Sequence, residues 1–163
     1  RLEKINNYKI EGERKVKEIS NKEFFVAGLS AYLTGGSKKG VSFATPDPGI
    51  ANFISKWLEV FFKVPPEKFR FLITLKRLNK NKIKITRRFW SKYLGFPIRQ
   101  FKVSRSYKSN RSKKNKLKLN KKLTSKSSER YGTLTIKVLK STDLFYRILG
   151  LTYGFFRSFK KNF

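Results

Sequence analysis

The sequence predicts an α/β (α+β) domain in which a small mixed or antiparallel sheet is covered by helices. Two observations indicate this class. Apolar residues recur at the helical period in some segments, and in others, such as 69–75 and 131–138, they alternate with polar residues as in half-buried strands. With 163 residues, the chain is most simply one domain with its own hydrophobic core.

The N-terminal part of the chain contains two predicted helices. Residues 1–20 are polar and mixed in charge, which predicts a surface helix or arm. Ser20 and Glu23 have the spacing of a capping box, and a glycine pair at 35–36 follows the next apolar run. We therefore expect a second helix between these signals, at the start of a domain that covers 21–153.

A helix followed by a strand is predicted twice in the middle of the chain. After a short strand at 41–45, an Asp–Pro pair begins a helix over 48–62, and a strand follows at 69–75. A shorter helix over 87–94 precedes a strand at 101–107. Each helix carries a Trp and each is stopped by proline, so the second unit repeats the plan of the first.

Residues 104–130 form a basic extension within the domain. Lys, Arg, Ser and Asn dominate it, and such a composition cannot bury a core by itself. The simplest topology pairs the strand at 101–107 with the one at 131–138, which makes the basic segment the long loop of a hairpin. A last helix begins at Ser141 or Thr142, and residues 154–163 form an aromatic and basic tail.

Small residues follow one face of the helix that precedes the glycine pair. Ala27, Ala31 and Gly35 recur at every fourth position, with Gly28 beside them. The remaining positions are mostly apolar, so we expect a helix that is buried almost all round. The helix-packing face is then either part of an ordinary core or the contact with a copy of the same helix, which would form a homodimer.

This helix resembles, in a worn form, the LAGLIDADG motif of homing endonucleases, and the resemblance extends over roughly 20–150. Aligning the head of the motif with residues 26–29 places Leu33 at the position of the metal-binding acid. Aligning its tail with Gly36 places Gly35 there instead. We prefer the tail alignment, because the serine, the strand and the long amphipathic helix that follow continue as in the family.

The resemblance implies a fold and a function. In the family, the motif helix is the domain interface, and the sheet face with its hairpin tips follows the nucleic acid. Neither alignment supplies the metal-binding carboxylate, because no acid occurs between Glu23 and Asp47. The family also has a two-stranded hairpin after the motif helix. Here only residues 37–40 separate the helix from its first strand, so one strand is short or lost.

Composition excludes several kinds of chemistry. The chain has no Cys and no His, which excludes disulfides, thiolate chemistry, His-based metal sites and the usual catalytic triads. The ten acids are scattered, whereas Mg²⁺-assisted hydrolysis needs clustered carboxylates. We therefore expect no catalytic residue, no cofactor and no metal. The alternative is an active homing endonuclease or intron maturase with acids supplied from elsewhere.

The charge balance points to a polyanionic partner. Lys and Arg number 40 and Asp and Glu 10, a net charge of +30. Nucleic acid is the expected partner, and RNA is favoured over DNA because extended basic stretches thread into folded RNA. No apolar run approaches the length of a membrane span, and no membrane partner is expected. The residues predicted to bind nucleic acid are Lys38, Lys39, Arg70, Lys76, Arg77, Lys102, Arg105, Tyr107, Lys108, Arg111, Lys113, Lys114, Lys116, Lys118, Lys121, Lys122 and Lys137.

The predicted function is that of a non-catalytic RNA-binding component of a ribonucleoprotein, such as a ribosome, where other proteins are further partners. For Gly35 to Gly40, a helix end and turn explains the glycines better than a phosphate-cradling loop, although Lys38 and Lys39 would still reach a phosphate. Lys exceeds Arg, and Asn, Ile and Phe are plentiful, which indicates an AT-biased coding sequence. An intracellular location is expected, in a mitochondrion or in the cytoplasm of an AT-rich microbe.

Overall fold

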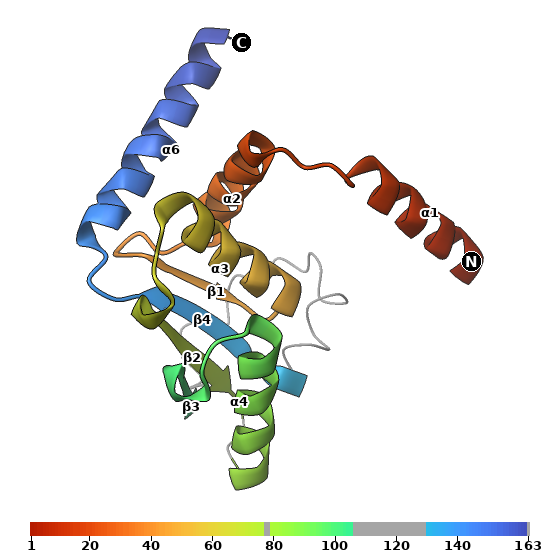
Figure 1. Ribbon diagram of the computed structural model, residues 1–163, viewed down its shortest axis with the longest axis vertical. Helices are drawn as coiled ribbons and strands as arrows, with labels where there is room; N and C mark the ends of the chain where they lie inside the picture. The colour runs from red at the N-terminus through yellow and green to blue at the C-terminus, as the bar shows by residue number, and fades with distance from the viewer. Residues whose placement is uncertain (77–78, 106–129, 163) are drawn as a thin grey trace, which may run out of the picture.

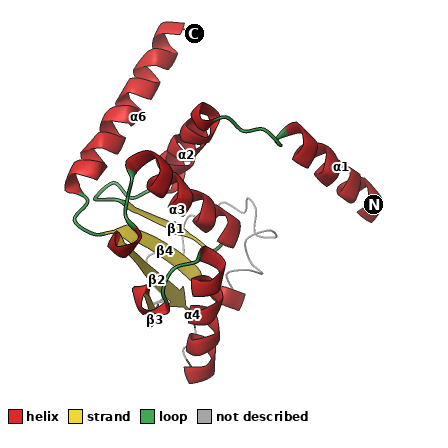
Figure 2. Ribbon diagram, in the orientation of Figure 1, coloured by secondary structure: helices red, strands yellow, loops and turns green. Residues whose placement is uncertain are grey.

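A computed structural model describes residues 1–76, 79–105 and 130–162 of the chain. Helices and strands are mixed along it, which confirms the α/β class (Figure 2). In chain order the elements are α1 (Leu2–Lys15), α2 (Asn21–Gly35), β1 (Ser42–Thr45), α3 (Pro48–Phe62), the 3₁₀-helix η1 (Pro66–Lys68), β2 (Phe69–Leu75), α4 (Lys80–Leu94), the 3₁₀-helix η2 (Ile98–Gln100), β3 (Phe101–Arg105), β4 (Thr133–Val138) and α6 (Thr142–Asn162).

The four strands form one mixed sheet in the order β1-β4-β2-β3. Strand β4 is antiparallel to both β1 and β2, whereas β2 and β3 are parallel. Helix α4 connects the two parallel strands, because a parallel pair needs a crossover that returns the chain to the same end of the sheet. Of the two sheet types that the sequence left open, the mixed one is therefore correct.

The predicted hairpin between the strands at 101–107 and 131–138 is wrong. Strand β2 lies between β3 and β4, so the connection from Arg105 to Arg130 joins strands on opposite sides of β2 and not the two arms of a hairpin. The physical reason is that β2 is buried at every second position and is hydrogen-bonded along both edges. This apolar strand takes an interior place in the sheet, and β3 takes the edge.

Strand β4 also begins two residues later than predicted. Gly132, just before it, has φ of 73°, a left-handed conformation that glycine adopts without strain. A Cβ at this position would lie 2.6 Å from the carbonyl oxygen of Thr74, so the close approach of two strands also requires glycine here.

The core lies between the sheet and the helices that cover one of its faces. Figure 1 shows α3 and α4 in front of the sheet, and α2 also contacts α3 and β1. The strand register aligns Phe43, Ile136, Phe71 and Phe101 in one row across the four strands. All four are buried, and the Phe71 and Phe101 rings stack with centroids 4.5 Å apart.

The predicted repeat is visible as two consecutive units, α3–η1–β2 and α4–η2–β3. Each helix contributes a Trp with 0% exposure. The indole nitrogen of Trp57 donates to the Phe25 carbonyl at 3.1 Å, and that of Trp90 donates to the Tyr131 carbonyl at 3.0 Å. Both indoles are thus buried with their N–H groups satisfied, and each ties its helix to a distant segment of the chain.

Helix α4 is longer than the predicted 87–94. It starts at Lys80, because the side chain of Asn79 accepts a hydrogen bond of 2.6 Å from the backbone N–H of Lys82. Its first two turns are mostly polar, with Ile85 61% exposed, so the apolar periodicity that marks its second half does not reveal its start. The cap residue, Asn79, is the feature of the sequence that marks the start of α4.

Helix α2 begins as predicted, but the prediction that it is buried all round is wrong. The Ser20–Glu23 capping box is present, whereas Ala27 is exposed and Ala31 is half-buried. A Cβ on Gly28 would lie 2.0 Å from the Trp57 side chain, and one on Gly35 would lie 2.6 Å from the Phe43 ring. The space beside the two glycines of the helix-packing face is therefore filled by side chains of α3 and β1 of the same chain. The homodimer remains a prediction.

A single strand, β1, separates α2 from α3, and an isolated bridge between Gly36 and Phe43 precedes it. At the ends of the chain, α1 has no buried residue, and α6 extends from β4 past α2 and includes residues 154–162 of the predicted tail (Figure 1).

Candidate nucleic-acid interface

The sheet face opposite the core row is named here the open face. Its side chains alternate in sequence with the buried ones and none of them is buried. The cations on this face sit among mostly small residues, and none of its described residues carries a carboxylate. Its residues are Ser42, Ala44, Arg70, Leu72, Thr74, Lys102, Ser104, Thr133, Thr135 and Lys137.

Two cations of the open face lie directly opposite each other. Arg70 on β2 is in register with Lys137 on β4, and Lys137 is in turn in register with Ser42 on β1. Like charges at such positions repel, and the antiparallel pair would be more stable with a neutral residue at either place. Ion pairs occur instead within helices, as between Lys56 and Glu59 at 2.9 Å. The Arg70–Lys137 pair is therefore suited to an anion that binds between the two groups.

The Arg70 guanidinium is held in place by backbone carbonyls of residues that precede it in the chain. Its Nη1 donates to the carbonyl oxygens of Glu67 and Phe69, each at 2.7 Å. A guanidinium has five N–H donors, and these two bonds use only those of Nη1. The donors of Nη2 and Nε are left for a ligand, in an orientation that does not have to be ordered on binding.

The structure brings together Arg70, Lys102 and Lys137 from the predicted set, but it places Arg105 elsewhere. Lys102 is opposite Leu72 on the open face. Arg105 is exposed, alternates in phase with Phe101 and is opposite Leu75, so it belongs to the helix-covered face. Alternation along the strand separates it from Lys102, and its binding to nucleic acid stays a prediction.

The remaining predicted cations divide into two groups. Lys76 is exposed and follows the last residue of β2. Lys38 and Lys39 are exposed on the loop between α2 and β1. The other predicted residues lie outside the described part of the chain; they are Arg77, Tyr107, Lys108, Arg111, Lys113, Lys114, Lys116, Lys118, Lys121 and Lys122.

The loop that carries Lys38 and Lys39 is a closed turn. The Tyr32 hydroxyl donates to the Gly40 carbonyl at 3.2 Å, and the Ser37 hydroxyl accepts from the Lys39 backbone N–H at 3.1 Å. Burial of the Tyr32 ring raises the pKa of its hydroxyl, so this donor stays protonated at neutral pH. These hydrogen bonds support the interpretation of residues 35–40 as a helix end and turn. The two lysines extend from this hydrogen-bonded backbone.

Several carboxylates have local structural roles. Asp47 accepts from the backbone N–H of Ile50 at 3.0 Å at the start of α3. Glu23 accepts from the backbone N–H of Ser20 at 2.7 Å, and its hydrogen bonds with Ser20 lower the pKa of the Glu23 carboxyl. Within the ranges that the structure describes, no three Asp or Glu side chains gather where they could hold a metal ion.

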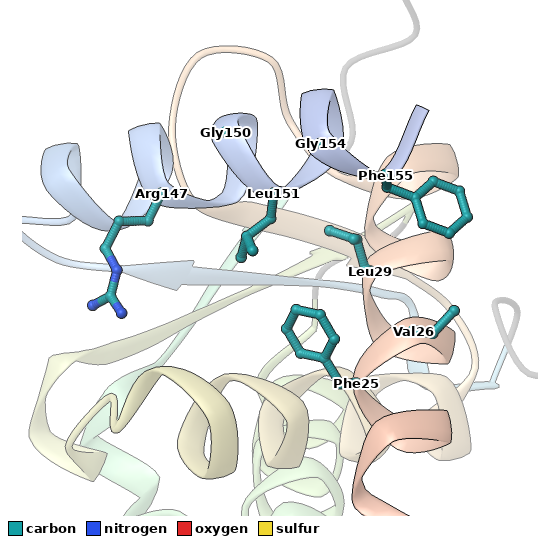
Figure 3. Close-up of a pocket in the computed structure, with 8 residues that line it drawn as sticks. All are labelled: Phe25, Val26, Leu29, Arg147, Gly150, Leu151, Gly154 and Phe155. Atoms are coloured by element: carbon teal, nitrogen blue, oxygen red, sulfur yellow. The ribbon is translucent and has the colours of Figure 1, made fainter. Parts of the chain in front are cut away.

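An apolar hollow of about 580 Å³ lies between α2 and α6 (Figure 3). Phe25, Val26 and Leu29 of α2 line it together with Leu151 and Phe155 of α6. The lining is apolar except for one arginine, so this groove lacks the paired cations that a nucleic-acid backbone requires. It is not the candidate interface.

A second hollow, of about 430 Å³, adjoins the open face at the beginning of β2 and β3. It is lined by residues of η1 and η2, by one residue of β2 and by the proline before η2: Pro66, Glu67, Arg70, Pro97, Arg99 and Gln100. Arg99 and Gln100 were absent from the predicted site. The signal that could have identified them is the repeat itself. Once β2 and β3 are parallel neighbours, the two Pro-containing turns that precede them must lie side by side.

No helix in the described part of the chain is both long and apolar enough to cross a bilayer. Comparisons of the chain with protein-family models, with curated proteins and with solved structures found no match. The function of the chain is therefore inferred from its own residues and their arrangement.

Proposed function

We propose that this chain is a non-catalytic RNA-binding protein with a LAGLIDADG-like fold, and that it acts as a component of a ribonucleoprotein such as a ribosome. The open face would bind the phosphate backbone. The observation that carries the proposal is the Arg70–Lys137 pair, two cations in register on a face whose described residues include no carboxylate. A bound phosphate would neutralise a repulsion that the free sheet retains.

The net charge of +30 supports a partner with many phosphates. Neutralising phosphates releases counterions, and this term dominates the affinity of basic proteins for nucleic acids. Among its described residues, the open face has no aromatic side chain on which bases could stack, and Leu72 holds its central position. Backbone contacts therefore account for binding to this face, and they carry no sequence information.

RNA is favoured over DNA by the composition of residues 104–130. Extended stretches of Lys, Arg, Ser and Asn fit the irregular grooves of folded RNA and become ordered there. A LAGLIDADG-like origin is supported by the order of motif helix, strand and long helix in α2, β1 and α3. Gly35 at the expected position of the metal-binding acid supports a non-catalytic role.

The proposal is tested by removing the two lysines of the open face that have no structural hydrogen bond to lose. A Lys102→Gln/Lys137→Gln variant should bind a single-stranded RNA of random sequence more weakly. With two phosphate contacts removed, the slope of log K against log salt should flatten by about 1.4, since each contact on a single strand contributes about 0.7. Fluorescence anisotropy over a salt series measures this slope.

A charge-matched control separates the open face from the overall charge. Lys22 on α2 and Lys92 on α4 are both exposed and lie on helices away from this face. A Lys22→Gln/Lys92→Gln variant should leave the slope close to that of the parent. Equal flattening in the two double variants would show that net charge, and not the open face, determines binding. A duplex DNA of the same length that bound more tightly than the RNA would contradict the preference for RNA.

A further inference from the structure

We propose that the hollow between η1 and η2 receives one unstacked nucleotide of the bound RNA and selects guanine. This inference rests on the proposed function and adds a base-reading site to a face that otherwise contacts the backbone. The hollow adjoins the open face through Arg70, which belongs to both. An RNA strand held at Arg70 and Lys137 would therefore have a neighbouring nucleotide at the mouth of this hollow.

The hollow has a size suited to a small ligand. Its volume of about 430 Å³ lies at the lower end of the range of roughly 300–1,000 Å³ that is typical of ligand pockets. Pro66 and Pro97 provide an apolar surface on its two sides, and the charged and amide side chains come from the residues that follow them. This combination of apolar walls and a few polar groups is typical of sites that hold a flat, polar-edged ring.

The walls of the hollow are tied together before any ligand binds. The Gln100 side chain is 6% exposed, and its Nε2 donates to the carbonyls of Pro66 at 2.7 Å and Phe69 at 2.8 Å. These bonds cross from η2 to η1 and β2. Arg70 is fixed from the other side by its bonds to the Glu67 and Phe69 carbonyls. Little ordering is then needed on binding, which favours affinity.

The charges around the hollow match the edges of guanine. Guanine presents the O6 and N7 acceptors on one edge, which suit a bidentate arginine such as Arg99. On its Watson–Crick side it presents N1–H and N2–H donors, which suit the Glu67 carboxylate. The plane of the Arg70 guanidinium, held by the backbone, offers a surface for stacking. Adenine places an N6 donor where guanine has O6, so it would oppose Arg99 with a donor.

The same residues argue against a simple phosphate site. Two guanidinium groups alone would attract a free anion, but Glu67 also lines the hollow and its carboxylate repels one. A nucleobase uses both signs of charge, because it carries donors and acceptors on different edges. The site is therefore assigned to a base, and the phosphates of the same strand are assigned to Arg70 and Lys137.

The test compares short single-stranded RNAs that differ at one position. An oligouridylate with one central guanine should bind about tenfold more tightly than plain oligouridylate, and one with a central adenine should not. The Glu67→Gln variant should lose the preference for guanine while the salt dependence stays close to that of the parent. Glu59→Gln, the same change on α3, is the matched control and should keep the preference.

The outcomes separate the two proposals. If the parent binds the guanine-containing, adenine-containing and plain RNAs equally well, the base site is refuted and the RNA-binding function stands. If Glu67→Gln keeps the full guanine preference, the base site is also refuted, because its carboxylate is then not the reader. If no RNA binds at low salt, the proposed function itself fails, and the base site fails with it.

Discussion

Replacing Lys137 with Gln should stabilise the free protein and weaken its binding to RNA. Lys137 lies opposite Arg70 in the β2–β4 register, and no residue described on this face is a carboxylate. Opposed cross-strand pairs change stability by roughly 0.2–1 kcal/mol, so removal of one charge should raise the free energy of unfolding by about that amount at low salt. For a chain of this size, 1 kcal/mol corresponds to a shift in Tm of about 2–4 °C.

Salt gives this prediction a second test. The Debye length is about 10 Å at 0.1 M salt and about 3 Å at 1 M, so the repulsion between half-buried Arg70 and exposed Lys137 should be screened at high salt. The stability gain of Lys137→Gln should therefore disappear in 1 M NaCl, approximately the salt at which RNA binding is also lost. Thermal melts of the free protein at low and high salt measure the gain, and anisotropy measures the RNA affinity.

Lys102 provides the control for this experiment. It lies on the same face but opposite Leu72, so it has no opposed cation in its strand pair. Lys102→Gln should change stability by no more than about 0.5 kcal/mol, as is usual for surface substitutions, while it flattens the RNA salt slope as Lys137→Gln does. If Lys137→Gln is no more stable than Lys102→Gln at low salt, the two cations do not repel each other, and the argument for an anion site between them is refuted.

Three further predictions follow from α2 and its neighbours. Gly28→Ala should cost about 1–3 kcal/mol, because its Cβ would lie 2.0 Å from the Trp57 indole, whereas Gly150→Ala on α6, where a Cβ meets nothing within 4 Å, should not destabilise the protein in urea melts. Ser20→Ala should lower Tm more at pH 7 than at pH 3. Its partner Glu23 has a lowered pKa in the folded state, so this stabilisation is present above the unfolded pKa and is lost as pH falls through the folded pKa. The purified protein should leave duplex DNA libraries uncut with Mg²⁺ or Mn²⁺, since no carboxylate occupies the motif position; specific double-strand cuts would revive the endonuclease alternative.

Local chemistry was sufficient to predict most helix ends and most strands. The Ser20–Glu23 box, and Asp47 followed by Pro48, form their caps as the sequence indicates, because a cap depends on residues within one turn of each other. The alternation over Phe69–Leu75 matches the buried pattern of β2 at every position. The predicted start of α4 was wrong by two turns, because this helix begins at the Asn79 cap and not where its apolar periodicity begins.

The sequence by itself also determined the nature of the candidate site: a net charge of +30, no Cys, no His and no acid between Glu23 and Asp47. The tertiary structure alone decided which of these cations meet. Pairing of β4 with β2, and not with β3, places Lys137 opposite Arg70. The parallel pairing of β2 with β3 brings the turns of η1 and η2 together around one hollow. Strand partners are set by packing between segments that are distant in the chain. A register shift of one residue moves the side chains of a strand to the other face, and a different neighbouring strand gives them different partners. Periodicity within a segment therefore cannot determine which strands pair.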